Sequence, residues 1–220
     1  MRPRTARERA RRAAAAHEAA VVRHAAGLCL HYPDDAFHER APLMRAALTR
    51  VPGTGADLLL GFLDDVRSRT PQDLAAHYVT VFDLRNRRSL YLSWWREGDT
   101  RLRGAALVRF KQVYRAHGLE FVGEELPDFL PVLLEFTATG GPSATVAGEE
   151  LLNEHRPGIE LLRFALTDAK TPYTAVIEAV CATLPGASPK DREQARALAR
   201  NGPPREEVGL ETYGTNGVGR

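Results

Sequence analysis

Apolar side chains recur at intervals of three and four residues along most of this chain, which is the pattern of amphipathic helices. The first such run covers about residues 17–32 and ends before Pro33, since proline cannot continue a helix. The next two runs cover residues 43–51 and 57–67, with Pro52 and Gly53 between them. The pattern therefore predicts three helices in the first third of the chain.

A fourth helix has the clearest start signal. Thr70 stands at the N-cap position, Pro71 at the first helical position, and Asp73 in the first turn, where a carboxylate is favoured by the free N–H groups. Its apolar positions fall on one face and predict a buried stripe formed by Leu74, Tyr78, Val81 and Phe82.

The short run of residues 89–95 is ambiguous, because it is rich in aromatic and apolar residues and fits a strand as well as a helix. A single strand would have no sheet to join, so we interpret this run as helical. Trp94 and Trp95 are adjacent and would lie about 100° apart on a helix. At least one of the two indoles is therefore expected at a surface or in a groove.

Helical patterns continue through the second half of the chain. The expected helices cover residues 99–118, 127–136, 143–155, 157–166 and 171–184. Asp128 follows Pro127, so its carboxylate is expected to cap the first turn of its helix. Since no run of alternating strands is present, the sequence predicts an all-α fold, a single compact helical bundle.

Composition predicts where the helical domain begins and ends along the chain. The 220 residues are 44% hydrophobic, which is enough for one sizeable core, and the formal net charge is only +2. Arginines crowd the first dozen residues, whereas residues after Pro185 are rich in Pro, Gly and charge and offer little to bury. We therefore expect a basic flexible arm at 1–16, a helical domain at 17–184 and a disordered tail at 185–220.

The basic arm could bind nucleic acid or an anionic membrane, but a solvated, frayed terminus is the simpler interpretation. His17, Glu18 and Arg23 interrupt the apolar residues that follow Arg11-Arg12, so no signal peptide is expected. No later run reaches the roughly 18 apolar residues of a membrane span. The sequence thus predicts a cytoplasmic protein without stable membrane insertion.

Catalytic and metal-binding patterns are weak throughout. His24 and His31 lie seven residues apart, which places them near one helix face, but no third ligand accompanies them. Cys29 and Cys181 have no Cys or His neighbour at metal-ligand spacing, so both are expected to be buried thiols. No nucleophile motif and no phosphate-binding loop is present. We expect neither an enzyme nor a metal or cofactor site.

The stretch from Tyr78 to Glu135 is different, since it combines both tryptophans with interleaved arginines and carboxylates, a mixture that is typical of recognition surfaces. Its sequence blocks resemble the NarJ/NarW-type nitrate reductase molybdenum cofactor assembly chaperones, within the TorD-like class of redox-enzyme maturation proteins. The blocks that carry the resemblance are Tyr78–Asp83, Arg88–Leu92, Gly98–Ala105, Tyr114–Gly118, Glu125–Pro131 and Leu134–Phe136.

The resemblance implies an all-helical chaperone without catalytic activity or a cofactor of its own. Its partner would be the N-terminal segment of the catalytic α subunit of respiratory nitrate reductase, held until the molybdenum cofactor is inserted and before the subunit docks on the membrane. Molybdenum cofactor delivery proteins are further implied partners, and nucleic acid is not. The resemblance leaves open whether the chaperone is a monomer or a dimer.

Together, residue chemistry and resemblance predict a groove for an amphipathic client helix, with aromatic walls and acidic residues that meet basic side chains of the client. The predicted client-binding residues are Tyr78, Phe82, Asp83, Tyr91, Trp94, Glu97, Asp99, Arg103, Glu125 and Asp128. Two alternatives stay open: a chaperone for another molybdenum oxidoreductase, and an arginine-rich nucleic-acid-binding helical protein, whose affinity would fall steeply with salt.

Overall fold

A computed structural model describes residues 6–84, 86–185, 188–189 and 193–194. Within these residues the α-helices are α1 (Ala6–Leu30), α2 (Asp35–Leu48), α3 (Thr54–Arg67), α4 (Pro71–Tyr78), α5 (Trp94–Glu97), α6 (Leu102–Ala116), α7 (Leu130–Thr139), α8 (Pro142–Glu154), α9 (Arg156–Asp168) and α10 (Tyr173–Ala182). A π-helical turn (Val79–Asp83) continues α4, and a 3₁₀ turn covers Asn86–Arg88. The predicted all-α fold is confirmed.

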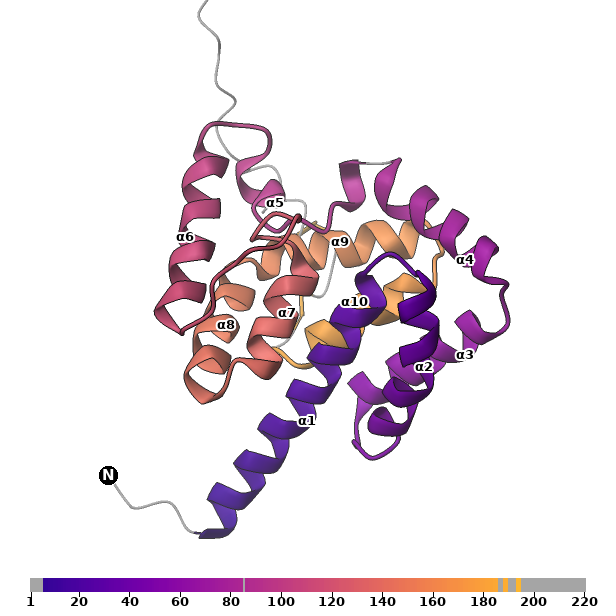
Figure 1. The fold of residues 1–220 in the computed structure, drawn as a ribbon, viewed down its shortest axis with the longest axis horizontal. Coiled ribbons are helices and arrows are strands. Elements are labelled where there is room, and N and C mark those ends of the chain that lie inside the picture. Colours follow the sequence, from indigo (N-terminus) through magenta and orange to yellow (C-terminus); the bar gives the residue numbers. More distant parts are fainter. Residues whose placement is uncertain (1–5, 85, 186–187, 190–192, 195–220) are drawn as a thin grey trace, which may run out of the picture.

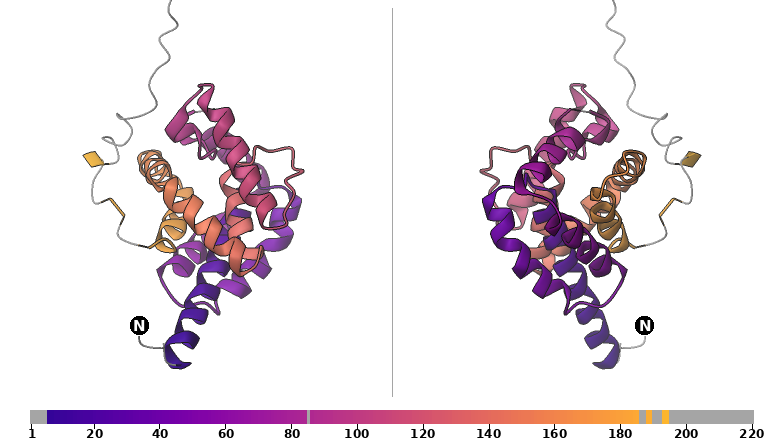
Figure 2. Two further views of the ribbon diagram at one scale, coloured as in Figure 1. Left: turned by 90° about the vertical axis from the view of Figure 1, so that its left-hand side faces the viewer. Right: turned by 90° about the vertical axis from the view of Figure 1, so that its right-hand side faces the viewer.

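Helix α1 runs through the middle of the molecule. Helices α2, α3 and α4 lie on one side of it and α6, α7 and α8 on the other (Figure 1). Helix α1 packs against α7, α10, α2 and α3, while α10 also packs against α3 and α9. The side views show the first turns of α1 projecting beyond the rest of the molecule (Figure 2).

The first helix begins at Ala6, well before the predicted start near His17. Four consecutive alanines at 13–16 have the highest intrinsic helix propensity, and the surrounding arginines are also good helix formers. Residues 6–16 therefore extend α1 as an exposed helix. Residues 1–5 lie outside the described part of the chain.

The buried face of α1 is wider than one amphipathic stripe, because other helices surround it. Val22, Ala26, Cys29 and Leu30 are all buried. A helix with several neighbours needs apolar or small residues around most of its circumference. The sequence pattern thus predicted a helix here but did not indicate that it is buried on several sides.

Helix α2 also begins earlier than predicted. The Asp34 carboxylate accepts a hydrogen bond from the Phe37 N–H at 2.9 Å and caps the helix, and Pro42 lies inside it instead of before it. In contrast, the predicted start of α4 is confirmed, since the Thr70 hydroxyl accepts from the Asp73 N–H at 3.2 Å. All four residues of the predicted stripe on α4 and the turn that follows it are buried.

The helical interpretation of residues 89–95 is wrong for its first half. Tyr91 forms an isolated antiparallel bridge with Phe129, and only Trp94–Glu97 is helical. The partner is the segment just before α7, which also begins later than predicted, at Leu130 instead of Pro127. The extended segment around Tyr91 thus pairs with a segment almost forty residues later in the chain, and no local sequence pattern indicates this pairing.

The remaining predicted helices match α6, α8, α9 and α10 closely, and Gly118, with φ of +78°, ends the α6 segment as expected. Gly158 allows α9 to approach the 89–95 segment, because a Cβ there would lie 2.6 Å from the Trp95 Cβ.

No helix in the described ranges is long and apolar enough to cross a membrane. Most of the predicted tail at 185–220 lies outside them.

Candidate functional site

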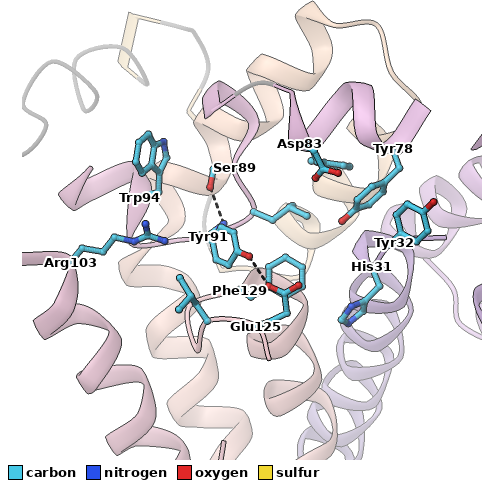
Figure 3. A pocket seen from close by; sticks show the side chains of 13 residues that line it. His31, Tyr32, Tyr78, Asp83, Ser89, Tyr91, Trp94, Arg103, Glu125 and Phe129 are labelled. Carbon is cyan, nitrogen blue, oxygen red and sulfur yellow. Dashed lines mark hydrogen bonds between the residues drawn. The ribbon is translucent and has the colours of Figure 1, made fainter. Parts of the chain in front are cut away.

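A pocket of about 710 Å³ opens where the C-terminal end of α1 meets four segments from the middle of the chain (Figure 3). These segments are the end of α4 with its π-helical turn, the 89–94 segment, the start of α6, and residues 125–129. The pocket is lined by His31, Tyr32, Tyr78, Phe82, Asp83, Ser89, Leu90, Tyr91, Trp94, Arg103, Glu125, Leu126 and Phe129.

Aromatic rings form much of the pocket wall and contact one another. The rings of Tyr78 and Phe82 lie 4.9 Å apart between centroids, and those of Tyr91 and Phe129 lie 5.3 Å apart. The Tyr78 hydroxyl donates to the Leu30 carbonyl at 2.9 Å, which ties this wall to the end of α1. Since the rings are held by each other and by the backbone, the wall exists before any ligand arrives.

The π-helical turn decides which residues face the pocket. Continuing α4 with i→i+5 bonds over Val79–Asp83 shifts the register of the last side chains relative to an α-helix. Phe82 and Asp83 both line the pocket, although they are adjacent in sequence. The turn therefore places an aromatic ring and a carboxylate next to each other at the pocket edge.

A buried carboxylate anchors the 89–93 segment. Asp128 is fully buried, and its Oδ2 accepts from the Ser93 N–H at 3.0 Å and from the Ser93 hydroxyl at 2.5 Å. Two backbone bonds flank this contact, from the Leu92 N–H to the Asp128 carbonyl and from the Leu130 N–H to the Leu90 carbonyl, each at 2.9 Å. Asp128 therefore holds the segment that carries Tyr91 and Trp94.

Tyr91 stands in the middle of the pocket and donates its hydroxyl hydrogen to Glu125 Oε2 at 2.6 Å (Figure 3). Burial, followed by this hydrogen bond, raises the pKa of the Tyr91 hydroxyl well above its usual value. Tyr91 consequently stays protonated at neutral pH and remains a donor, which keeps the exposed Glu125 side chain at the pocket rim.

Seven of the ten predicted client-binding residues line this one pocket: Tyr78, Phe82, Asp83, Tyr91, Trp94, Arg103 and Glu125. Glu97, Asp99 and Asp128 do not line it. Glu97 pairs with Arg96 at 3.3 Å, and Asp99 is exposed away from the pocket. The predicted helix-capping role of Asp128 is wrong, because its carboxylate binds Ser93 across the loop.

Sequence reasoning missed the contribution of α1 to the pocket. His31 packs edge-on against Phe129 at 5.6 Å, and Tyr32 packs edge-on against Tyr78 at the same centroid distance. The only local signal was a pair of aromatic residues just before the helix-ending Pro33. Their proximity to residues more than forty positions away depends on how α1 packs.

Comparison with known proteins identifies the family of this chain. The family model described as nitrate reductase delta subunit matches residues 42–178. The chain belongs to the nitrate reductase delta subunit family. The match includes all the pocket residues except His31 and Tyr32.

Curated relatives agree with this assignment. The chain is 40% identical over 163 residues to the nitrate reductase-like protein NarX of Mycobacterium tuberculosis, covering 74% of this chain but only 24% of that protein. It is 33% identical over 152 residues to the nitrate reductase molybdenum cofactor assembly chaperone NarJ of Escherichia coli K12, covering 68% and 63% of the two chains. A probable NarJ of Bacillus subtilis is 27% identical over 156 residues, covering 70% and 83%.

Both cysteines of this delta-subunit-family chain are buried and free, as predicted. Burial raises the pKa of the Cys29 thiol to about 12, so it stays protonated at neutral pH. Within the described ranges no three His, Cys, Asp or Glu side chains come together in a way that could hold a metal ion.

The buried His155 and the half-buried His31 are expected to make this family member less stable in acid. Desolvation lowers the pKa of His155 and of His31 below the usual 6.5. A histidine whose pKa is lower in the folded state binds protons more readily when unfolded, so the stability is present above about pH 6.5 and is lost as pH falls below it. We expect a lower free energy of unfolding at pH 5 than at pH 7.5, measured by urea denaturation.

A His155→Gln variant should show a smaller difference between the two pH values, whereas His17→Gln, at an exposed position, should keep the wild-type difference. Comparing the two pH values within each variant removes any constant loss of stability caused by the substitution. An unchanged pH difference in the His155 variant would show that this imidazole is not responsible.

Proposed function

We propose that this chain is a nitrate reductase molybdenum cofactor assembly chaperone that performs no catalysis itself. Its pocket would bind the N-terminal segment of the catalytic α subunit before the cofactor-loaded enzyme docks on the membrane. The NarJ relatives carry this chaperone role in their names. Because the chain spans about a quarter of the NarX relatives it matches, the client and the timing of binding belong to the proposal.

The observation that carries the proposal is the pocket with aromatic walls and acidic edges. An amphipathic peptide helix could lay its apolar face against Phe82, Tyr91 and Trp94. Asp83 has no hydrogen-bond or ion-pair partner among the described residues, and Glu125 is held only by the Tyr91 hydroxyl. Both carboxylates are thus accessible to basic side chains of a peptide.

Calorimetric titration of the α-subunit N-terminal peptide into the full chain tests this proposal. We expect Trp94→Ala to weaken binding about tenfold, because truncating an aromatic anchor in an interface typically removes more than 1 kcal/mol. Asp83→Asn should weaken binding about threefold at low salt and less at high salt, since surface charge pairs are weak and screened.

Two neighbouring variants serve as matched controls. Leu84→Ala removes an exposed apolar side chain next to Asp83, and Asp99→Asn removes an exposed carboxylate near Trp94, but neither residue lines the pocket. Both should bind like the wild type. Wild-type affinity in the Trp94 and Asp83 variants, with the fold intact, would mean that the peptide binds elsewhere.

The nearest alternative is a chaperone for another molybdenum oxidoreductase. The same pocket would then serve, and only the peptide would differ. Titrating N-terminal peptides of other molybdenum enzymes from the same organism under identical conditions separates these clients, because the tightest binder identifies the partner.

A further inference from the structure

Arg103 places a guanidinium at one end of the pocket. Its Cζ lies 5.7 Å from the Tyr91 ring centroid and 5.9 Å from the Trp94 ring centroid, so the cation is stacked among aromatic rings. It forms no ion pair with any described residue. An arginine in such a position keeps its charge at any physiological pH and can bind a planar carboxylate through two parallel hydrogen bonds.

A hydrogen bond to Ser93 holds the guanidinium of Arg103 in place. Ser93 donates its single hydroxyl hydrogen to Asp128. Toward any other partner, Ser93 Oγ can therefore act only as a hydrogen-bond acceptor. Arg103 Nε donates to this oxygen at 3.3 Å. Arg103 lines the pocket, and among the described residues its two terminal Nη groups form no hydrogen bond.

The opposite end of the pocket carries negative charge. Asp83 and Arg103 project from opposite sides of the cavity, with Tyr91 and Glu125 between them (Figure 3). A uniformly basic peptide would satisfy the acidic end but would meet repulsion at Arg103. The charges therefore favour a peptide that carries a cation toward Asp83 and a carboxylate toward Arg103.

We propose that Arg103 binds a carboxylate side chain of the client peptide and thereby fixes the direction and register in which the peptide lies. This inference rests on the proposed function, because it assumes that a peptide occupies the pocket. Asp128 and Ser93 act as positioning residues that hold the guanidinium. Tyr91 and Trp94 hold the guanidinium between their rings.

A double-mutant cycle tests this assignment. Each Asp or Glu of the α-subunit N-terminal peptide is replaced in turn by its amide, and the peptides are titrated into the wild type and into Arg103→Gln. We expect one amide peptide to bind the wild type about tenfold more weakly, and the same replacement to have little effect on the Arg103→Gln variant. Arg103→Lys should recover part of the affinity, because it keeps the charge but not the bidentate geometry.

Arg101→Gln is the matched control, since it removes an equal charge from an exposed side chain two residues away that does not line the pocket. It should leave the affinities of the whole peptide series unchanged. A purely structural role of Arg103 would lower the affinity for every peptide equally, and that result would overturn the inference.

The experiment also separates this inference from the proposed function. In one outcome, every peptide with an Asp or Glu replaced by its amide binds the wild type as tightly as the parent peptide, while Trp94→Ala still weakens binding. The pocket then binds the client, but Arg103 does not bind a carboxylate of it. If Trp94→Ala has no effect on any peptide, the pocket is not the client site and both statements fail. The peptide replacements are informative even if an Arg103 variant does not fold, because they leave the protein unchanged.

Discussion

Replacing Asp128 by alanine is expected to lower the free energy of unfolding by about 2–3 kcal/mol and to weaken peptide binding as well. The carboxylate is the acceptor for two donors of Ser93, and all of these groups are buried. Alanine would leave a buried N–H without an acceptor, at a cost of about 1–3 kcal/mol, and would add a small cavity. Because Asp128 Oδ1 has no hydrogen-bond partner, removing the charge offsets part of this loss.

Urea denaturation followed by circular dichroism and by tryptophan fluorescence measures this effect. Both tryptophans lie at 94–95, next to Ser93, so the fluorescence change reports on the segment that Asp128 anchors. Asp99→Ala, at an exposed position, is the control and should change stability by less than about 0.5 kcal/mol. If Asp128→Ala unfolds at the wild-type urea midpoint, the buried contact does not hold the segment.

Replacing Glu160 by alanine is expected to cause the largest loss of stability, about 3–4 kcal/mol. Glu160 is fully buried between Arg163, whose Nε donates to its Oε2 at 2.8 Å, and Arg156, whose Nε lies 3.6 Å from its Oε1. Removing this fully buried carboxylate takes a close counter-charge away from two mostly buried guanidinium groups, and breaking such buried pairs typically costs about 3–5 kcal/mol.

Two further variants bracket this expectation. Glu160→Gln keeps the size and one acceptor oxygen and should cost less, about 2 kcal/mol. Glu178→Gln removes a 3.9 Å pair to Arg163 in which Glu178 is 39% exposed, and should cost less than about 1 kcal/mol. The free energy of unfolding of each variant is measured by urea denaturation at pH 7. Equal decreases for Glu160→Ala and Glu178→Gln would show that the buried ion pairs of Glu160 stabilise the fold no more than the exposed pair of Glu178.

The Asp128 and Glu160 clusters have different consequences for function. Glu160 belongs to α9, and neither it nor its two arginine partners lines the pocket. Asp128 also lies outside the pocket, but it contacts Ser93, which contacts Arg103 in the pocket. At equal loss of stability, we therefore expect peptide affinity to respond to Asp128 and not to Glu160.

Much of the site could be predicted from the sequence, because its residues cluster in one stretch of unusual chemistry. Tyr78, Phe82, Tyr91 and Trp94 were expected together on the basis of aromatic content and family resemblance, and they share one pocket. Asp128 was misplaced for a physical reason. An acid after a proline fits a helix cap by local rules, but α7 begins two residues later and leaves the carboxylate free to bind Ser93.

The burial of Arg23 likewise could not be predicted from local sequence rules. Arg23 interrupts the apolar pattern of α1 and looks like a solvated side chain in the sequence. In the structure it is 1% exposed, pairs with Glu149 at 2.7 Å and donates to the Thr183 carbonyl at 2.9 Å. Its partners lie far along the chain, on or next to α8 and α10, and no local spacing connects them.

The sequence by itself determined the helical class, most of the helices and the family, because apolar periodicity and sequence blocks are local properties of the chain. Tertiary structure alone decided that His31 and Tyr32 join the pocket, that residues 89–93 pair with the segment before α7, and that Asp128 fixes Ser93 and, through it, Arg103. These features depend on contacts between residues distant in sequence, and such contacts form only when the helices pack.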